Sequence, residues 1–311
     1  MDIGGTNIRA GVFPENGNTP ITLKKIPTRG PETAQERAIR LISELWPKEH
    51  TVIALGITAP GPVDPRNGVV YSAPNIPDWR NLPLKSIISG NFGVPVSIGN
   101  DANMAALGEW KFGAGQGHHD ILYLTISTGI GGGVILEDRL LLGWQGLASE
   151  LGHVTVEPNG PLCNCGQMGH LEAVASGPAI SRYVSTQIVN GRPSLLAGSS
   201  SLSAEKIAQA ALKGDELAIE ALKRAGEFIG NALADFLHVF NPSIIILGGG
   251  VSRSGKFFID TIRNAIYQRV FSPQYTFNLK ITTAALADDA GLLGALALAR
   301  LNTPPGQDHA T

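Results

Sequence analysis

Three glycine-rich turns, each placed directly after an apolar run, limit the folds open to this chain more than any other feature of its sequence. The turns are Gly4-Gly5-Thr6-Asn7 after Ile3, Thr128–Gly133 after Ser127, and Gly248–Gly250 after Leu247. Glycine lets backbone N–H groups approach an anion, and a turn offers several such donors at once. Each turn alone is equally typical of a hairpin or of a strand end that needs a positive φ. The three together, two of them adjoining Thr6 or Thr128, favour a phosphate site divided between two domains.

Two common nucleotide-binding motifs are absent from the sequence. No G-x-G-x-x-G with a later acid follows the first strand, and no G-x-x-x-x-G-K-[ST] occurs. A nucleotide, if one binds, is therefore not held in the manner of a Rossmann fold or a P-loop.

The order of the elements predicts an α/β chain with a repeated unit. The length of 311 residues suggests two domains, and both halves open with a strand, a glycine-rich turn and a strand. Helical spacing of apolar residues predicts helices over residues 33–47, 215–240, 255–270 and 289–300. Ser203 is expected to cap a further helix, and Asn241-Pro242 to stop the helix over 215–240. Seven prolines between Ala59 and Pro95 predict rigid loops without regular structure, and Gly113–Gly117 predicts a linker.

Composition excludes several classes of protein. The net charge of −2 and a pI of about 6.4 give no basic field for nucleic acid or anionic lipid. No run of 18 apolar residues suggests a membrane span, and the start at Met1-Asp2 lacks a signal-peptide pattern. With two cysteines in all, the chain is not a disulfide scaffold. We therefore expect a cytoplasmic protein with no nucleic-acid or membrane partner.

A candidate catalytic carboxylate follows a buried strand. Asn100-Asp101 comes directly after the apolar run 94–98 and before a predicted helix. Open α/β sheets place ligands at such strand ends, and phosphoryl transfer to a hydroxyl needs one positioned base. The alternative is a helix N-cap, because Asp and Asn are among the best caps.

The strongest local pattern is a cluster of cysteine and histidine. It consists of His153, Cys163, Cys165 and His170. In a reducing compartment such a cluster favours a metal site over a disulfide, and two thiolates with two imidazoles suit tetrahedral zinc with no open position, which is a structural site. The alternative is a coincidence of two buried thiols and two surface histidines, since the spacing fits no standard zinc finger.

With these residues assembled, the chain resembles the ROK family of sugar kinases, in the hexokinase/actin-like ATPase superfamily, over nearly its whole length. Asp2–Asn7 and Ser127–Gly133 look like the two phosphate motifs, and Leu247–Gly250 like the adenosine motif. Gly99–Asn103 resembles the catalytic segment. Glu150–His153 together with Cys163–Glu172 resembles the family signature.

The resemblance implies two ribonuclease-H-like domains of the actin/hexokinase type around a central cleft. The N-terminal domain would cover residues 1–117, joined by a C-terminal helix at about 288–303, and the C-terminal domain with its zinc loop would cover 118–287. The implied reaction transfers the γ-phosphoryl group of ATP, bound with Mg²⁺, to a hexose hydroxyl.

The resemblance also implies a role for each site residue. Asp101 would be the general base for the sugar 6-hydroxyl. The sugar would be held by Asn75, Asn100, Asp101, Glu150, His153 and Glu172. ATP would be bound by Asp2, Gly4, Gly5, Thr6, Asn7, Thr128, Gly129 and Gly249, with Asp2 near magnesium. Structural Zn²⁺ would be bound by His153, Cys163, Cys165 and His170, and His153 would use its other ring nitrogen on the sugar.

Three positions depart from the family pattern. His170 stands where a third cysteine is usual, and Ser149 stands where glycine is common. Only Met1 precedes Asp2, so we expect a shortened first strand.

Glucose is the expected substrate, because Cys163-Asn164-Cys165-Gly166 looks more like the glucokinase branch than the fructokinase branch. N-acetylglucosamine, N-acetylmannosamine and mannose kinases remain alternatives, as do a donor other than ATP, a sugar-responsive regulator and a catalytically dead sugar-binding protein. A homodimer is expected from family habit and from a charged fraction of only 16 %.

Overall fold

The computed structural model describes residues 1–76 and 78–303, which form two compact units. Unit 1 contains Met1–Gly117, Leu140–Ser149 and the residues from Ala285 onward. Unit 2 contains His118–Arg139 and Glu150–Ala284. The chain therefore passes between the units four times.

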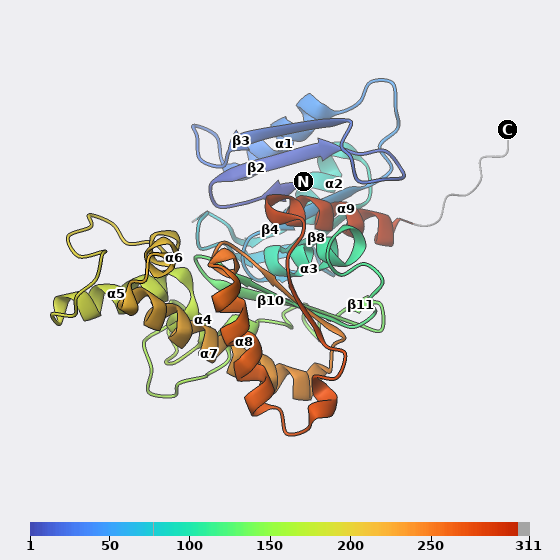
Figure 1. Ribbon diagram of the computed structural model, residues 1–311. Helices are drawn as coiled ribbons and strands as arrows, with labels where there is room; N and C mark the ends of the chain where they lie inside the picture. Colours follow the sequence, from blue (N-terminus) through green and yellow to red (C-terminus); the bar gives the residue numbers. More distant parts are fainter. Residues whose placement is uncertain (77, 304–311) are drawn as a thin grey trace. The chain divides into compact units, whose positions relative to one another are not determined.

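Unit 1 is built on a five-stranded sheet with the order β3-β2-β1-β4-β8 (Figure 1). Its strands are β1 (Asp2–Ile3), β2 (Asn7–Val12), β3 (Thr22–Pro27), β4 (Leu55–Ala59) and β8 (Val96–Asn100). The first three are antiparallel, whereas β4 lies parallel to both β1 and β8. The predicted hairpin with a glycine turn is confirmed, with Asp2 opposite Arg9, and its first strand is only two residues long.

Unit 2 repeats this sheet with the order β11-β10-β9-β12-β13. Its strands are β9 (Ile121–Ile126), β10 (Ile130–Leu136), β11 (Arg139–Leu140), β12 (Ile244–Gly248) and β13 (Lys280–Thr283). β9 and β10 form the antiparallel hairpin, and β12 pairs in parallel with β9 and β13. The central strands β9 and β12 are continuous apolar runs because both of their faces are buried. The repeated α/β unit predicted from the sequence is confirmed.

The helices of unit 1 pack closely enough to require glycine. They are α1 (Ala34–Leu45), α2 (Leu84–Phe92), α3 (Asp101–Phe112) and α9 (Ala290–Asn302). α3 and α9 lie side by side (Figure 1): a Cβ on Gly294 would lie 1.8 Å from the carbonyl oxygen of Met104. A Cβ on Gly108 would lie 2.5 Å from the carbonyl oxygen of Ala290. The two helices therefore meet backbone to backbone.

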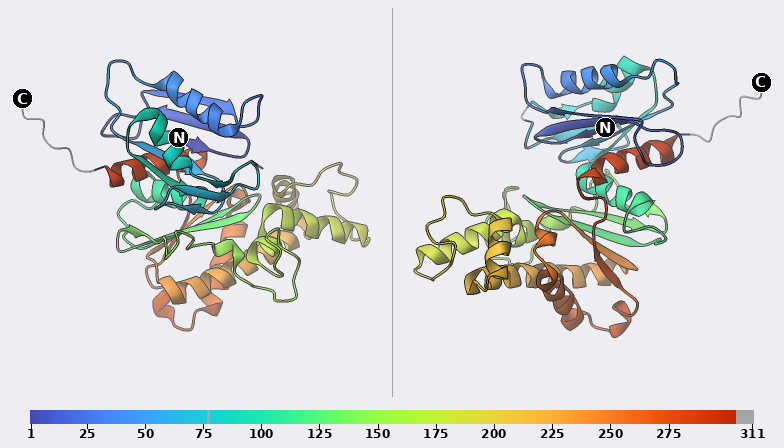
Figure 2. Two further views of the ribbon diagram at one scale, coloured as in Figure 1. Left: turned by 180° about the vertical axis from the view of Figure 1, so that it is seen from behind. Right: turned by 45° about the horizontal axis from the view of Figure 1, so that its top comes forward.

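Unit 2 carries the longest helix that the structure describes. Its helices are α4 (Leu171–Ala175), α5 (Gly177–Val189), α6 (Ala204–Leu212), α7 (Glu216–Phe240) and α8 (Lys256–Arg269). α7 and α8, amber and orange in Figure 2, touch where a Cβ on Gly230 would lie 2.5 Å from the carbonyl oxygen of Ile262. Asn241, at φ 46°, ends α7 as the sequence predicts. Short 3₁₀ turns occur at Leu151–His153, Val251–Arg253, Pro273–Tyr275 and Ala287–Asp289.

The expectation of irregular loops between Ala59 and Pro95 is wrong. This segment forms a small antiparallel sheet of β5 (Val63–Asp64), β6 (Val69–Ser72) and β7 (Arg80–Leu82), followed by α2. Its prolines lie where a missing N–H group costs no ladder bond: Pro62 and Pro65 flank β5, and Pro83 caps α2. The many prolines of this segment are therefore compatible with short strands and a helix, and they do not exclude regular secondary structure.

None of the helices within the described residues combines the length and the apolar character that a bilayer crossing requires.

Candidate functional site

The first glycine-rich turn joins β1 to β2 in unit 1. The N–H group of Gly4 donates to the carbonyl oxygen of Asn7 at 2.9 Å, and the Thr28 hydroxyl donates to the carbonyl oxygen of Gly4 at 2.6 Å. Asn75 lies directly against this turn, because a Cβ on Gly5 would come within 2.6 Å of the Asn75 Cβ. The fold therefore brings a residue from the proline-rich segment to the turn that the sequence marks as a phosphate motif.

Asp101 stands at the carboxyl end of β8 as the first residue of α3. The helix cap is Asn100, whose Oδ1 accepts a hydrogen bond from the N–H group of Asn103 at 2.9 Å. The Asp101 carboxylate instead accepts from the N–H group of Ala102 at 2.9 Å. The capping alternative thus applies to Asn100, and the carboxylate of Asp101 is left for another task.

Both acidic groups in this part of unit 1 are harder to ionise than an ordinary aspartate. Burial is the main cause of the raised pKa of Asp2, opposed by the N-terminal ammonium group and Arg9 and reinforced by the charge of Asp101. Surrounding protein likewise raises the pKa of Asp101, against the N–H group of Ala102. Because the Asp101 side chain is exposed to solvent, we expect its shift to be small.

The second glycine-rich turn joins β9 to β10 in unit 2 and is supported by Glu172. The Glu172 carboxylate accepts from the N–H group of Ile130 at 3.0 Å, and a Cβ on Gly129 would lie 2.5 Å from the same oxygen. The N–H group of Gly177 donates to the carbonyl oxygen of Ser127 at 2.9 Å. A side chain at position 129 would therefore displace the Glu172 carboxylate from the N–H group of Ile130.

The third turn requires glycine for two reasons. Gly249 has a φ of +81°, and a Cβ there would lie 2.2 Å from the carbonyl oxygen of Ile126. The Ser252 hydroxyl donates to the carbonyl oxygen of Gly249 at 2.7 Å and closes the turn. This turn is thus held against β9, beside the second turn.

A cavity of about 910 Å³ in unit 2 adjoins the second and third turns. Thr128 and Gly250 line it from these turns, and α5 contributes Pro178 and Ser181. Its volume lies at the upper end of the range for small-molecule sites, roughly 300–1,000 Å³. Unit 2 by itself therefore offers a pocket large enough for a nucleotide.

Much of the wall of this cavity escapes sequence reasoning. Glu205, Gln209 and Leu212 line it from α6, and Arg253 lines it from the 3₁₀ turn after Gly250. No local pattern marks these residues, because α6 follows an irregular loop and joins the cavity only through the fold. The sequence does predict the start of α6, where the Ser203 hydroxyl accepts from the N–H group of Lys206.

The four cysteine and histidine residues of the predicted metal site converge in unit 2. Their ligand atoms all lie within 4.8 Å of one another, and they belong to His153, Cys163, Cys165 and His170. The Nδ1 atoms of the two histidines are 3.3 Å apart, and the Sγ atoms of Cys163 and Cys165 lie 3.8 and 3.2 Å from the Nδ1 atoms of His153 and His170. Tetrahedral zinc with ordinary bond lengths places its ligand atoms about 3.3–3.8 Å apart.

The donor set fits a divalent cation chemically as well. The Nδ1 atoms of the two imidazole rings face each other with no acceptor between them. This arrangement is expected if the lone pairs of both nitrogens point at one bound ion. Burial raises the pKa of the Cys163 thiol, which a nearby cation would reverse. The Nδ1 atom of His170 lies with the other three ligand atoms, so His153, Cys163, Cys165 and His170 could together supply four ligands to one ion.

Two residues connect this cluster to the other candidate residues of unit 2. Cys163 Sγ lies 3.7 Å from Oε1 of Glu172, the residue that supports the second turn. His153 ends a 3₁₀ turn that starts after Glu150, and its N–H group donates to the Glu150 carbonyl oxygen at 3.0 Å. The cluster, Glu150 and the second turn therefore belong to one local structure.

The predicted sugar-binding residues are divided between the two units. Among the predicted sugar-binding residues, Asn75, Asn100 and Asp101 belong to unit 1, and Glu150, His153 and Glu172 belong to unit 2.

Comparison with known proteins places these features in context. The model of the ROK family matches residues 1–302. The chain is 40 % identical to a glucokinase of Thermotoga maritima, with 96 % of this chain and 95 % of that protein covered.

Solved structures give the same result. A ROK family glucokinase from Streptomyces griseus, in complex with glucose and AMPPNP, matches with a TM-score of 0.79 and 39 % identity over 97 % of this chain and 98 % of that one. A ROK family transcriptional regulator, homologous to the MLC protein of E. coli, matches with a TM-score of 0.88 and 31 % identity, over 97 % of this chain and 76 % of that one. The predicted fold class is confirmed by this agreement.

Proposed function

Because this chain belongs to the ROK family, we propose that it is an ATP-dependent glucokinase, a phosphotransferase that phosphorylates the 6-hydroxyl group of D-glucose. The observation that carries the proposal is the position of Asp101, a carboxylate at the carboxyl end of a parallel strand that does not serve as the helix cap. Identity of 38–40 % to glucokinases over nearly the full chain supports glucose as the substrate.

Asp101 acts as the general base in this proposal. Its carboxylate accepts the proton of the sugar 6-hydroxyl as that oxygen bonds to the γ-phosphorus of ATP, and the bond from the γ-phosphorus to the bridging oxygen breaks to release ADP. Most of the catalysis comes from positioning and from charge stabilisation, so a single aspartate suffices. The raised pKa of Asp101 makes its carboxylate a better proton acceptor than an ordinary aspartate.

The nucleotide occupies the cavity of unit 2. Its adenosine lies toward the third turn and α6, and its phosphates lie toward Thr128 and the adjoining Gly129 of the second turn. The first turn of unit 1, with Gly4, Gly5, Thr6 and Asn7, supplies further phosphate contacts. The complex of a relative with AMPPNP, an analogue of ATP, supports ATP as the donor.

Asp2 is the residue of unit 1 that would hold the Mg²⁺ ion accompanying ATP. The ion would neutralise charge on the phosphates. Burial raises the pKa of Asp2 against the opposing charges of the N-terminal ammonium group and Arg9, and a bound cation would lower it.

The sugar is held by polar groups from both units. Asn75 and Asn100 contribute from unit 1, and Glu150, His153 and Glu172 contribute from unit 2. The two domains in this proposal are residues 1–117 with the C-terminal helix and residues 118–287. Each of them contributes contacts to the sugar.

His153, Cys163, Cys165 and His170 would hold a structural Zn²⁺ ion, which would fix the conformation of the loop that carries them. With Nδ1 directed at the cluster, His153 keeps Nε2 for a sugar hydroxyl, and this division fixes its tautomer. Metal binding would thus orient a sugar contact without taking part in the phosphoryl transfer.

We further propose that the protein works as a homodimer in the cytoplasm, where glucose phosphorylation opens glycolysis. Size-exclusion chromatography with light scattering would measure the number of chains.

The test is a coupled assay of ADP release with magnesium and ATP. It compares glucose, mannose, fructose, N-acetylglucosamine and N-acetylmannosamine, with Asp101→Asn as the matched variant. We expect turnover to be highest on glucose and to be lost in the variant. Preference for an N-acetyl sugar would keep the mechanism and replace the substrate.

Sugar binding without turnover on any of the five would instead favour a sugar-responsive regulator. That alternative rests on the similarity to a ROK transcriptional regulator.

A further inference from the structure

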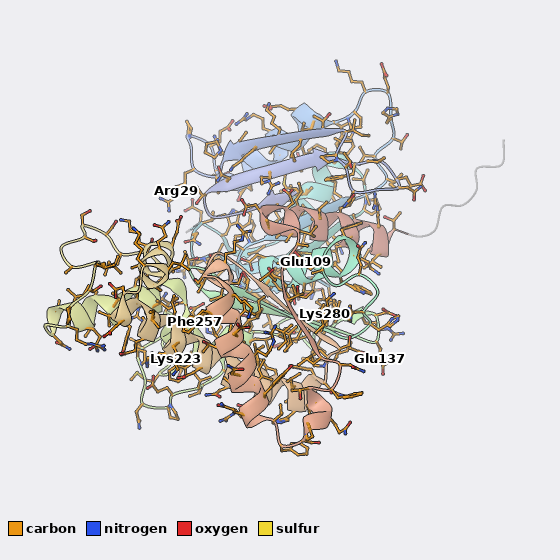
Figure 3. All side chains as sticks on the ribbon, viewed as in Figure 1. Arg29, Glu109, Glu137, Lys223, Phe257 and Lys280 are labelled. Atoms are coloured by element: carbon orange, nitrogen blue, oxygen red, sulfur yellow. The ribbon has the colours of Figure 1, made fainter. Side chains whose placement is uncertain are left out.

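Glu109 is a fully buried carboxylate that the proposed reaction does not use. It lies on α3, three residues before the end of the helix, and its exposed fraction is 0 % (Figure 3 labels it). A buried carboxylate costs free energy unless hydrogen bonds compensate it. Its partners therefore indicate why this position is acidic.

Three backbone N–H groups donate to the Glu109 carboxylate. Oε2 accepts from Ala114 at 2.8 Å and from Ala285 at 3.1 Å, and Oε1 accepts from Leu286 at 2.8 Å. The Glu109 carbonyl oxygen also accepts from Gly113 and Gly115, at 3.0 and 2.9 Å. One residue thus binds two segments that are about 170 residues apart in sequence.

Both segments are places where the chain passes between the units. Unit 1 ends at Gly117 on the outgoing path and begins again at Ala285 on the return path. On the return path the change is abrupt, because the N–H group of Ala284 donates to Leu247 of β12 in unit 2, at 2.9 Å. The next N–H group, on Ala285, already donates to Glu109 of unit 1.

The base of this arrangement is rigid. α3, which carries Glu109, contacts α9 backbone to backbone at Gly108 and Gly294. Leu286 leads into α9 through the 3₁₀ turn Ala287–Asp289. The carboxylate therefore joins the end of one closely packed helix to the approach to the other.

We propose that Glu109 is a positioning residue that anchors, within unit 1, the outgoing crossing at Ala114 and the returning crossing at Ala285 and Leu286. The anchor confines bending of these crossings to the backbone dihedral angles at Gly117–His118 and to ψ of Ala284 and φ of Ala285. Its effect on catalysis rests on the proposed function, in which groups of both units act on one sugar.

The direct test is amide hydrogen exchange on the full-length protein and on Glu109→Gln. Glutamine replaces one acceptor oxygen with a donor, so either Leu286 or the pair Ala114 and Ala285 loses its acceptor. We expect peptides that cover residues 113–117 or 284–288 to exchange about tenfold faster or more. Unchanged exchange in both peptides would overturn the anchor, whether or not the protein phosphorylates any sugar.

The kinetic test separates positioning from general destabilisation. Glu109→Gln is expected to lower kcat/KM for glucose about tenfold or more, because small displacements of reacting groups are costly. Binding of AMPPNP is expected to weaken less than kcat/KM falls, since the cavity that would hold the adenosine belongs entirely to unit 2. The control is Leu41→Ala, which removes a buried side chain of α1. We expect it to lower Tm as Glu109→Gln does and to leave kcat/KM unchanged.

A second pair of variants covers the case in which Glu109→Gln fails to fold. A Cβ on Gly113 would lie 2.2 Å from Oε2 of Glu109, so Gly113→Ala displaces the carboxylate from the opposite side. Gly90→Ala on α2 meets nothing within 4 Å and is the matched control. We expect faster exchange and reduced kcat/KM in Gly113→Ala alone.

If Leu41→Ala or Gly90→Ala lost as much kcat/KM as Glu109→Gln or Gly113→Ala, the effect of Glu109 would be one of stability alone. That result would overturn the positioning role. A wild-type protein without turnover on any hexose would overturn the proposed function, and the exchange experiment alone would then decide the anchor.

Discussion

In unit 1 the last strand of the sheet, β8, runs directly into Asn100, Asp101 and α3, whereas its counterpart in unit 2, β13, runs into Ala284 and the return to unit 1. The sheet order is the same in both units. One strand end therefore carries a carboxylate, and the equivalent strand end carries a crossing between units.

The glycine-rich turns differ in the same way. The turn of unit 1 is backed by Asn75, and the turn of unit 2 is backed by the carboxylate of Glu172, which also approaches Cys163. The cavity of about 910 Å³ and the cysteine and histidine cluster both lie in unit 2. A repeated sheet thus supplies positions, and the segments after its strands decide the chemistry.

The strongest way to break this comparison is Asp101→Asn. The proposed base is lost while the sheet of unit 1 is unchanged, so kcat for glucose should fall by about 10²–10⁴-fold. Steady-state assays of ADP release measure this loss. Calorimetric binding of AMPPNP should change far less than kcat, because the cavity lies in unit 2. Retention of more than about a tenth of wild-type kcat would assign the proton transfer to another group.

Zinc bound by the protein should depend on the cysteine and histidine cluster of unit 2. Cys165→Ser and His170→Ala should each weaken zinc binding on the order of 100-fold and lower Tm, since the four-ligand set becomes incomplete. Elemental analysis of the purified protein gives zinc per chain. His50→Ala, in unit 1, is the control and should keep its zinc. Full zinc content in His170→Ala would leave the fourth ligand to another group.

The third turn tests how far unit 2 depends on its glycines. Gly249→Ala forces a Cβ into a left-handed conformation and against the Ile126 carbonyl oxygen, which should cost about 1–3 kcal/mol and weaken AMPPNP binding about tenfold. Thermal unfolding and calorimetry measure the two effects. Gly250→Ala, with open space at its Cβ, is the control for stability. Equal losses in both variants would contradict the role of the close approach.

The smallest expected effect concerns the pH dependence of Asp101. The pKa of Asp101 is raised, so the folded protein binds this proton more tightly than the unfolded chain does. Protonation of Asp101 therefore stabilises the folded state below the ordinary pKa of aspartate, and this stabilisation is lost as the pH rises through the raised pKa. Asp101→Asn should therefore raise Tm at pH 7 by no more than about 2 °C, because solvent reaches the side chain. The difference should vanish near pH 3.

The rate in the wild type should change in the opposite sense. Activity should decline as the pH falls through the raised pKa, at a higher pH than an ordinary aspartate would give. A lower Tm for Asp101→Asn at pH 7 would contradict the sign of the shift.

Local patterns predicted those parts of the molecule whose determinants lie close together in sequence. The hairpin around Gly4–Asn7, the cap at Ser203 and the end of α7 at Asn241 each depend on a few neighbouring residues. The cysteine and histidine cluster belongs to this class too, because its residues occur within one loop, 153–170.

Features that depend on tertiary packing were beyond such patterns. Asn75 meets Gly5 across 70 residues, and α6 reaches the cavity only because α5 and α7 position it. The proline-rich segment misled because the spacing of the prolines, and not their number, leaves room for short strands. Glu109 was missed because a single acidic residue in a helix carries no sign that its partners lie far along the chain.

The contact of α9 with unit 1 also bears on the order in which the protein is assembled during synthesis. A Cβ on Gly56 of β4 would lie 1.8 Å from the carbonyl oxygen of Ala295, so the sheet of unit 1 is completed by a helix that is translated after unit 2. All of unit 2 is made in between, and its segments adjoin without any residue beyond Ala284. At ordinary elongation rates the ribosome needs roughly 10–35 seconds between Gly117 and α9. Unit 1 is thus started first and completed only after unit 2 has been synthesised, and a messenger truncated before α9 would leave the sheet of unit 1 without the helix that covers it.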